Sequence, residues 1–245
     1  MDLRLNDKIA LVTGAGSQIG YGRTIALTLA EEGCDVIAAD IDVDGAVKTV
    51  ASIEALGRKS LAVKVDVTRQ EEVDAMVKQA IDTFGRIDIL VNNAGSSSEL
   101  RPFLEMTEED WNYDIGINLL GQMRVAKAVL PHMISQKYGR IINTSGGQGI
   151  PNISIYGAAK AGVVMFTQAL AREVARHGVI VNAVGPGLGK TGLIYRAPEE
   201  FLEGERQRSL LKRLCTPDDV APVVAFLASD RCSYMVGQLI QLSTS

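Results

Sequence analysis

A chain of 245 residues and 26.2 kDa is long enough for one large α/β domain, and no linker, repeat or low-complexity segment divides it. Its net charge of -4 leaves no basic surface for nucleic acid, and no apolar run approaches the ~18 residues of a membrane span. We therefore expect a single domain over residues 1–245, in a soluble, cytoplasmic protein that binds neither nucleic acid nor membrane.

Short apolar runs rich in β-branched residues alternate with helical stretches along the chain. This alternation is typical of a parallel sheet whose strands are connected by helices. We predict an α/β fold, a single-domain Rossmann-type doubly wound parallel sheet with helices on both faces and ligands at the carboxyl ends of the strands. Strands are predicted at residues 8–13, 35–40, 60–65, 87–92, 140–144, 179–184 and 238–242, and helices at 23–32, 44–56, 71–84, 116–136, 155–177 and 217–229.

The first predicted strand runs into a glycine-rich loop, Thr13-Gly-Ala-Gly-Ser-Gln-Ile-Gly-Tyr-Gly22, and then into a helix. In this context backbone amides and the amino terminus of the helix hold a pyrophosphate. A tight turn without a ligand would need one or two glycines, whereas this loop has four. The pattern therefore predicts a dinucleotide site, to which the loop contributes Gly14, Gly16, Ser17, Gln18, Ile19 and Gly20.

Asp40 ends the second predicted strand, about twenty residues beyond the loop. A carboxylate at this place accepts hydrogen bonds from the hydroxyls of an adenine ribose and repels a 2′-phosphate, which favours NAD over NADP. Asp40 and its neighbour Ile41 are therefore predicted to bind the cofactor. The alternative role for Asp40 is a helix cap, but Asp42 or Asp44 fills that role more naturally.

Tyr156 and Lys160 are four residues apart in a predicted helix and so share a face. The ammonium of Lys160 would favour the ionised form of the Tyr156 phenol and lower its pKa from the usual ~10. A tyrosine with a lowered pKa can donate and accept a proton near neutral pH. The spacing alone is weak evidence, because many helices have it by chance.

Taken in order, these motifs resemble those of the classical short-chain dehydrogenase/reductase family over nearly the whole chain. Further matching motifs are Asp66-Val67 after the third strand, Asn92-Asn-Ala-Gly95 after the fourth, Asn118 in the next helix, and Asn182-Ala-Val-Gly-Pro-Gly187 followed by Thr191.

The resemblance implies an NAD(H)-dependent oxidoreductase that interconverts a secondary alcohol and a ketone. Tyr156 would be the general acid/base, Lys160 would tune it and hold the nicotinamide ribose, and Asn118 would hold a water in a proton relay. Candidate substrates are 3-hydroxyacyl or 3-oxoacyl thioesters and cyclic alcohols. The resemblance also implies a homotetramer and a cofactor site that includes Asp66, Val67, Asn93, Ala94, Gly95, Tyr156, Lys160, Pro186, Gly187 and Thr191.

The sequence departs from the family pattern just after the fifth strand, where a serine usually polarises the substrate carbonyl. Alignment from the start of the strand places Gly146 at that position, and the stretch from there to Tyr156 is about three residues short. We hypothesise that the neighbouring Ser145 supplies the hydroxyl. The competing hypothesis is a catalytically weak NAD-binding protein with a regulatory or assembly role.

Two other departures concern the glycine loop and the end of the chain. The loop matches the family spacing from Gly16 with a two-residue insertion after Thr13, or from Gly14 with Gln18 at a glycine position. The final segment, 237–245, replaces the Val-Asp-Gly-Gly that the family often has there, which puts the subunit contact at this end in doubt.

Residues 188–214 are predicted to form a substrate lid, because they follow the Pro-Gly turn and form a long connection. Basic residues in this segment would either attract an acidic substrate or form a solvated helix face, and nearby glutamates favour the second interpretation. The odd number and wide spacing of Cys34, Cys215 and Cys232 predict neither a disulfide framework nor a metal site, and we expect no metal.

Overall fold

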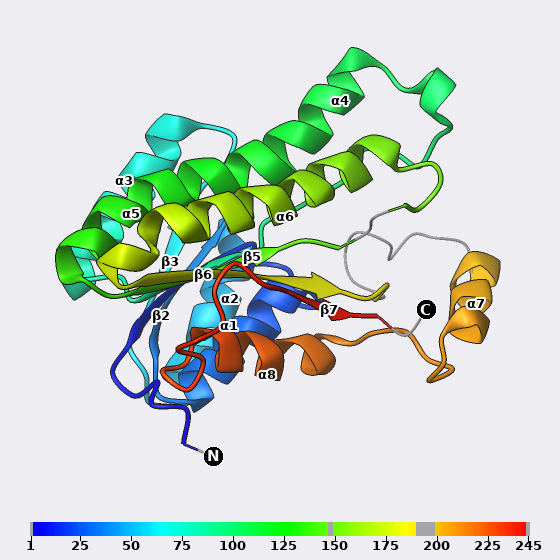
Figure 1. The fold of residues 1–245 in the computed structure, drawn as a ribbon. Coiled ribbons are helices and arrows are strands. Elements are labelled where there is room, and N and C mark those ends of the chain that lie inside the picture. Colours follow the sequence, from blue (N-terminus) through cyan, green and yellow to red (C-terminus); the bar gives the residue numbers. More distant parts are fainter. Residues whose placement is uncertain (1, 147–148, 190–198, 244–245) are drawn as a thin grey trace.

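The computed structural model describes residues 2–146, 149–189 and 199–243 (Figure 1). Seven parallel strands form one sheet in the order β3-β2-β1-β4-β5-β6-β7, which confirms the predicted Rossmann-type architecture. The strands are β1 (Ile9–Thr13), β2 (Asp35–Asp40), β3 (Ser60–Lys64), β4 (Ile89–Asn92), β5 (Gly139–Thr144), β6 (Val179–Pro186) and β7 (Leu239–Leu242).

Helices cover both faces of this sheet (Figure 1). One face packs against α1 (Tyr21–Glu31), α2 (Val43–Glu54) and α8 (Pro217–Ala228). The other face packs against α3 (Gln70–Phe84), α5 (Gln122–Gln136) and α6 (Ser154–Val174), and α4 (Glu108–Ile115) leads into α5. The shorter elements are η1 (Phe103–Glu105), η2 (Gly116–Gly121), η3 (Ala175–His177) and α7 (Glu199–Arg208).

The central strand β1 is buried at all five positions and apolar at the first four, because helices lie on both sides of it. Ala10 and Val12 pack toward α1 and α8, whereas Ile9 and Leu11 pack toward α3 and α5. The chain builds outward from β1 in both directions, with β2 on one side and β4 on the other. The connections therefore diverge after β1 and β4, which opens a crevice at the carboxyl ends of these strands.

Most predicted elements begin and end within two residues of their observed limits, but the helical region before β5 differs. The helix predicted from residue 116 is already formed from Glu108, where Thr107 and Asp110 form a capping box. Residues Gly116–Gly121 then form a π-helical turn, η2, between α4 and α5. The predicted lid contains the helix α7, for which the sequence indicated a solvated helix face without giving its bounds.

Within the described residues, no helix is both long and apolar enough to cross a membrane. No group of three His, Cys, Asp or Glu side chains that would hold a metal ion is found among them either.

Candidate active site

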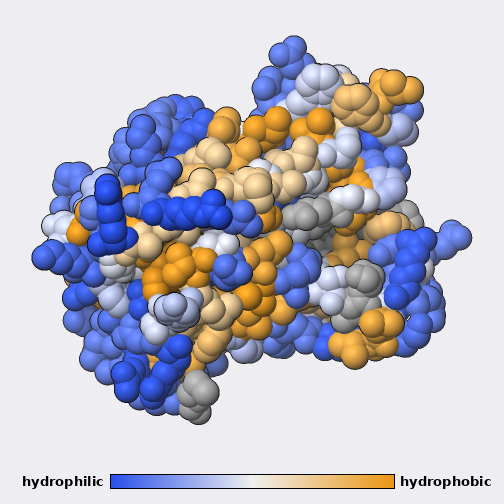
Figure 2. Space-filling model, in the orientation of Figure 1, coloured by the Kyte–Doolittle hydropathy of each residue, from blue (hydrophilic) through white to orange (hydrophobic). Residues whose placement is uncertain are grey.

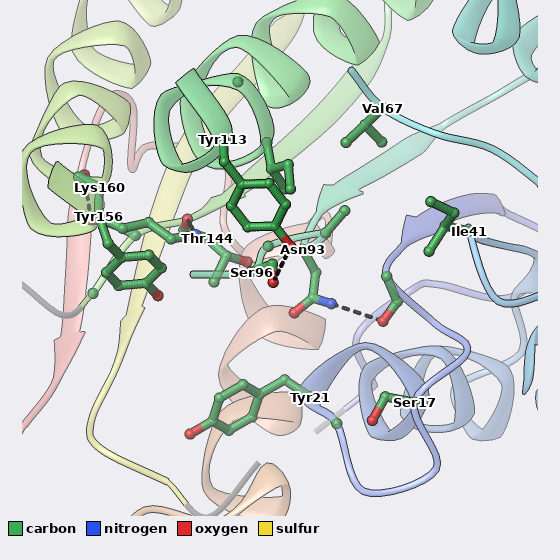
Figure 3. A pocket seen from close by; sticks show the side chains of 18 of the residues that line it. Ser17, Tyr21, Ile41, Val67, Asn93, Ser96, Tyr113, Thr144, Tyr156 and Lys160 are labelled. Carbon is green, nitrogen blue, oxygen red and sulfur yellow. Dashed lines mark hydrogen bonds between the residues drawn. The ribbon is translucent and has the colours of Figure 1, made fainter. Parts of the chain in front are cut away.

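A cavity of about 1060 Å³ lies at the carboxyl ends of the strands. The loops that follow β1 to β6 all contribute to its wall, so the sheet brings together residues from distant parts of the sequence. Figure 3 shows Tyr156 and Lys160 on one side of this cavity and Ser17, Ile41 and Val67 on the other.

The glycine loop and the start of α1 form the floor of the cavity. The N-cap of α1 is Gly20, which makes no side-chain cap, and the first turn contains no acidic residue, so amides there are available to an anion. A Cβ on Gly14 would lie 2.8 Å from the Ala94 Cα, and one on Gly22 would lie 2.1 Å from the Gly14 carbonyl oxygen. Glycine is therefore required for this close approach, and the donor set fits a pyrophosphate.

Only part of the predicted loop set reaches the cavity wall. Gly14, Ser17 and Gly20 line it, whereas Gly16, Gln18 and Ile19 do not. The Gln18 amide instead donates to the carbonyl of Gly16 (2.7 Å) and to that of Gly45 in α2 (3.0 Å), and the Ile19 side chain is 47% exposed. The side chain of Gln18 therefore joins the loop to α2. Because α1 begins at Tyr21, the register with a two-residue insertion describes the loop better.

Asp40 lies at the end of β2 on the cavity wall, as predicted. Its Oδ2 accepts a hydrogen bond from the Gly16 amide (2.7 Å) and its Oδ1 accepts one from the Asp42 amide (2.9 Å). Asp42 is the residue that caps α2, through the Gly45 amide. Each oxygen of Asp40 keeps one lone pair for a further donor, because a carboxylate has about four acceptor sites.

Asp66 and Val67 line the same side of the cavity as Ile41. Asp66 accepts hydrogen bonds from the amide (2.9 Å) and hydroxyl (2.7 Å) of Thr68, which hold this loop in shape. The Val67 side chain packs against Gly121 at the end of η2, where an added Cβ would lie 2.8 Å from Val67 Cγ2.

The segment after β4 ties the glycine loop to the centre of the sheet. The Asn93 amide group donates to the carbonyls of Thr13 and Gly14, both at 3.1 Å, and Figure 3 shows Asn93 pointing toward the loop. The Ala94 amide donates to the Thr13 hydroxyl (3.1 Å). Asn93, Ala94 and Gly95 all line the cavity, so their predicted place is found.

Tyr156 and Lys160 both lie in the first two turns of α6, buried and facing the cavity. The Lys160 Nζ lies 5.6 Å from the Tyr156 ring centroid and donates to the carbonyl of Thr144 (3.0 Å). Burial lowers the pKa of Lys160 to about 8.

Burial and, to a smaller extent, the nearby Asp114 carboxylate together raise the pKa of Tyr156 to about 12. The prediction that Lys160 lowers the Tyr156 pKa is therefore wrong for this structure. Desolvation disfavours the phenolate.

Asn118 lies in the π-helical turn η2 and does not line the cavity directly. Its amide nitrogen donates to the carbonyls of Ser96 (2.6 Å) and Asp114 (2.8 Å). A Cβ on Gly95 would lie 2.9 Å from Asn118 Oδ1 and 3.4 Å from Lys160 Nζ. The Asn118 oxygen and the lysine nitrogen therefore face the same small space beside Gly95.

Ser145 and Gly146 both line the cavity after β5. The Ser145 hydroxyl is buried and donates to the backbone carbonyl of Lys160 (2.9 Å). Gly146 has φ +107°, a conformation that favours glycine, and a Cβ there would lie 3.0 Å from the Pro186 carbonyl oxygen. The backbone path thus explains why a serine is absent from position 146.

The far end of the cavity is bounded by Pro186, Gly187, Leu188 and Gly189. The hydroxyl of Tyr21, a residue that the sequence reasoning missed, donates to the Gly187 carbonyl (3.2 Å) and joins the glycine loop to this segment. The predicted contact Thr191 lies outside the described residues, as does the part of the predicted lid over residues 190–198.

The described part of the lid segment contains α7, and its arginines are paired with acidic residues. Arg206 pairs with Glu199 (2.7 Å) and Glu203 (2.9 Å), and Arg208 pairs with Glu205. These contacts support the interpretation of a solvated helix face.

After α8, the atypical C-terminal segment supplies β7, which pairs with β6 at the edge of the sheet.

The wall also contains side chains that the sequence reasoning did not find. Ser96 and Tyr113 hydrogen-bond to each other through their hydroxyls (3.0 Å), and Figure 3 shows them between Tyr156 and Asn93. The capping box at Thr107 was the available signal for the helix that carries Tyr113. Further wall residues that were not predicted include Asn112, Arg124, Thr144, Ile150 and Ile153.

A doubly wound sheet with a glycine loop, a strand-end aspartate and a Tyr-Lys pair around one cavity defines a dinucleotide-dependent oxidoreductase. Residues 14–243 match the family described as enoyl-(acyl carrier protein) reductase. The chain belongs to the short-chain dehydrogenase/reductase family, whose members use a nicotinamide cofactor to interconvert alcohols and carbonyl compounds.

Individual relatives span nearly the whole chain. It is 39% identical over 241 residues to the 3-oxoacyl-(acyl-carrier-protein) reductase FabG of Thermotoga maritima, covering 97% of both chains. It is 40% identical over 241 residues to the cyclohexanol dehydrogenase of an Acinetobacter species, covering 97% of this chain and 94% of the relative. The solved structure of an NAD+-bound xylitol dehydrogenase superposes with a TM-score of 0.91 at 32% identity, covering 99% of this chain and 100% of that one.

Proposed function

We propose that this protein is an NAD(H)-dependent dehydrogenase that interconverts a secondary alcohol and a ketone. The observation that carries the proposal is that one cavity joins the Tyr156–Lys160 pair to the Asp40 carboxylate, across the glycine loop. We infer one NAD-binding and catalytic domain over residues 1–245, with a substrate lid at about 188–214.

Two features support NAD over NADP. Asp40 would present its carboxylate at the 2′ position of an adenine ribose, and the cavity wall beside it continues with Ile41 and Asp42 rather than with an arginine. The related xylitol dehydrogenase was solved with NAD+ bound. The first turn of α1 would hold the pyrophosphate, and Asp66, Val67 and Asn93 would line the adenosine half.

Bound NAD supplies the hydride acceptor at its nicotinamide ring, and NADH supplies the hydride donor. Tyr156 gives its phenolic proton to the ketone oxygen in reduction and takes the proton from the alcohol in oxidation. In reduction Lys160 would return a proton to Tyr156 and take one from a water held by the Asn118 oxygen in the small space beside Gly95. Pro186, Gly187 and Thr191 would bound the nicotinamide end.

The raised pKa of Tyr156 sets the direction of pH dependence. A protonated phenol is ready to donate at neutral pH, so ketone reduction is supported there. Alcohol oxidation needs the phenolate, whose fraction grows as the pH rises toward the pKa. Oxidation should therefore become faster through the alkaline range, which initial rates at a series of pH values would measure.

Ser145 is our candidate for the second contact to the substrate oxygen. Its hydroxyl donates to the Lys160 carbonyl in the structure, so a contact with substrate requires that it turns away from that carbonyl. Loss of such a donor costs on the order of 10²-fold in rate. We expect a Ser145→Ala enzyme to lose turnover to that extent, and full turnover in the variant would eliminate this role.

The substrate class is best sought among ketones and secondary alcohols related to the reactions of the relatives. The names of those relatives point to 3-oxoacyl thioesters and to cyclic alcohols. In the described part of the lid, Arg206, Arg208 and Arg213 are paired with acidic residues, which gives no added preference for an acidic substrate.

We also propose a homotetramer, the assembly expected from the family resemblance. Figure 2 shows apolar side chains gathered over α6 and near β7 on one face of the molecule, and Met165 of α6 is 59% exposed. Exposed apolar patches of this kind are typical of subunit contacts. Sedimentation equilibrium would measure the mass of the assembly.

The test of function follows the absorbance of the nicotinamide with NAD and a panel of secondary alcohols, and with NADH and ketones that include 3-oxoacyl thioesters. We expect turnover in the native enzyme and its loss in Tyr156→Phe, with NADH affinity nearly unchanged, because only the transferable proton is removed. If Tyr156→Phe loses NADH affinity as well as turnover, Tyr156 has a structural role. No turnover despite tight NADH binding would favour the binding-protein alternative, to which Gly146 gives some support.

A further inference from the structure

Asp114 is a fully buried acid beside the candidate active site, and no part of the proposed chemistry uses it. It lies next to the end of α4. Its Oδ1 accepts from the Ser98 amide (2.7 Å) and its Oδ2 accepts from the Ser98 hydroxyl (3.0 Å). The backbone amide of Tyr156 lies near enough to this carboxylate to lower its pKa.

Asp114 contacts residues of three segments whose relative positions determine the geometry of the site. Ser98 lies in the loop after β4, and Tyr156 lies in the first turn of α6. The backbone carbonyl of Asp114 accepts from the Asn118 side chain (2.8 Å), which in turn donates to Ser96 in the same loop (2.6 Å). Asp114 is thus the residue at which the loop, the π-helical turn and the helix of Tyr156 meet.

The start of α6 explains why an anion is useful here. The N-cap of α6 is Ile153, which makes no side-chain cap, and the first turn of the helix contains no acidic residue. The first amides of a helix lack partners within the helix and carry a partial positive charge. The carboxylate of Asp114 approaches one of these amides, that of Tyr156, from the neighbouring helix.

We propose that Asp114 is a positioning residue for Tyr156: its buried carboxylate supplies from α4 the cap that α6 lacks and holds Tyr156 in register with Asn118 and the 96–98 loop. This inference rests on the proposed role of Tyr156 as the proton donor and acceptor.

The charge of Asp114 also acts on the reaction. Burial raises the pKa of the Asp114 carboxyl, and the hydrogen bonds from Ser98 and the nearby backbone amide of Tyr156 oppose this rise. The titratable groups that act on it are Asp110 from α4 and Tyr156 from α6. Because the ionised carboxylate disfavours the phenolate, removing its charge should let Tyr156 ionise at lower pH.

The test is Asp114→Asn, which keeps the shape of the side chain and removes its charge. We expect the alkaline rise of alcohol oxidation to move to lower pH, and kcat to fall on the order of tenfold, the effect of one lost hydrogen bond to a charged group. We also expect faster amide hydrogen exchange in the first turn of α6. Asp114→Glu should restore the pH profile, since it restores the charge.

Glu109→Gln is the matched control, because it makes the same change from carboxylate to carboxamide on the same helix, at an exposed residue. It should leave the pH profile and the exchange of α6 unchanged. Ser98→Ala removes the hydroxyl that donates to Asp114 and keeps the charge of Asp114, so kcat should fall a few-fold while the pH profile stays native. This variant is the test if Asp114→Asn does not fold.

The inference is overturned if the Asp114→Asn enzyme keeps the native pH profile and native hydrogen exchange in α6. If Asp114→Asn does not fold, an unchanged kcat in Ser98→Ala overturns it instead. If the native protein shows no turnover, the proposed function fails instead, and the comparison of hydrogen exchange between Asp114→Asn and Glu109→Gln still decides the positioning role.

Discussion

At the scale of single residues, Lys160 illustrates the conflict between stability and function. A buried ammonium is costly, which is why its pKa falls from 10.5 to about 8. The folded protein therefore holds this proton less tightly than the unfolded chain does. The penalty is complete below about pH 8 and disappears as the pH rises through 10.5, so the contribution of Lys160 to stability increases between these values.

Lys160→Met keeps the apolar stem and removes the charge. We expect it to abolish turnover and yet to raise the free energy of unfolding at pH 7 by roughly 1–2 kcal/mol, after allowing for the lost bond to Thr144. Urea unfolding at pH 7 measures the expected gain in the free energy of unfolding, and the same measurement at pH 10 shows whether that gain becomes smaller. If Lys160→Met is less stable than the native protein at pH 7, burial of the charged lysine does not cost stability.

At the scale of elements, the turn after β5 decides which hydroxyl reaches the site. Gly146→Ser would place a side chain at φ +107° with its Cβ 3.0 Å from the Pro186 carbonyl. We expect a loss of about 1–3 kcal/mol in stability and no gain in kcat, because such a conformation is strained for residues other than glycine. Thermal unfolding and turnover test this. An equally stable, faster variant would show that the loop accepts the usual serine.

How much of the fold could be predicted differs between elements for physical reasons. Strands β1, β2 and β4 contain apolar runs buried on both faces, and the glycine loop leads directly into α1, so their places follow from the sequence. The π-helical turn of η2 could not be predicted, since it depends on Asn118 bonding to the Ser96 carbonyl in a distant loop.

Side-chain directions in the site were the least predictable feature. The sequence around Ser145 does not indicate that its hydroxyl donates a hydrogen bond to the backbone carbonyl of Lys160. Likewise the four-residue spacing of Tyr156 and Lys160 is real, but the lysine turns toward Thr144 and burial dominates the pKa of the tyrosine. Local spacing predicts which residues meet, whereas their environment comes from the packing of the whole sheet.

At the scale of the whole molecule, the cavity is lined by the loops after six of the seven strands. A dinucleotide bound there would contact segments from both halves of the sheet, so binding and global stability should be linked. A ligand at about 100 times its Kd adds about 2.7 kcal/mol to the free energy of unfolding. We therefore expect NADH to raise the melting temperature clearly more than NADPH at the same concentration.

Asp40→Ala should reduce this stabilisation by NADH and narrow the difference from NADPH, because it removes both the acceptor for the ribose and the charge that repels a 2′-phosphate. Asp44→Ala is the control, since it removes a carboxylate from the first turn of α2 and leaves the end of β2 intact. Thermal melting of the three proteins with each cofactor measures the preference without any substrate. Equal stabilisation of the native protein by NADH and NADPH would refute the assignment of Asp40, whatever the reaction proves to be.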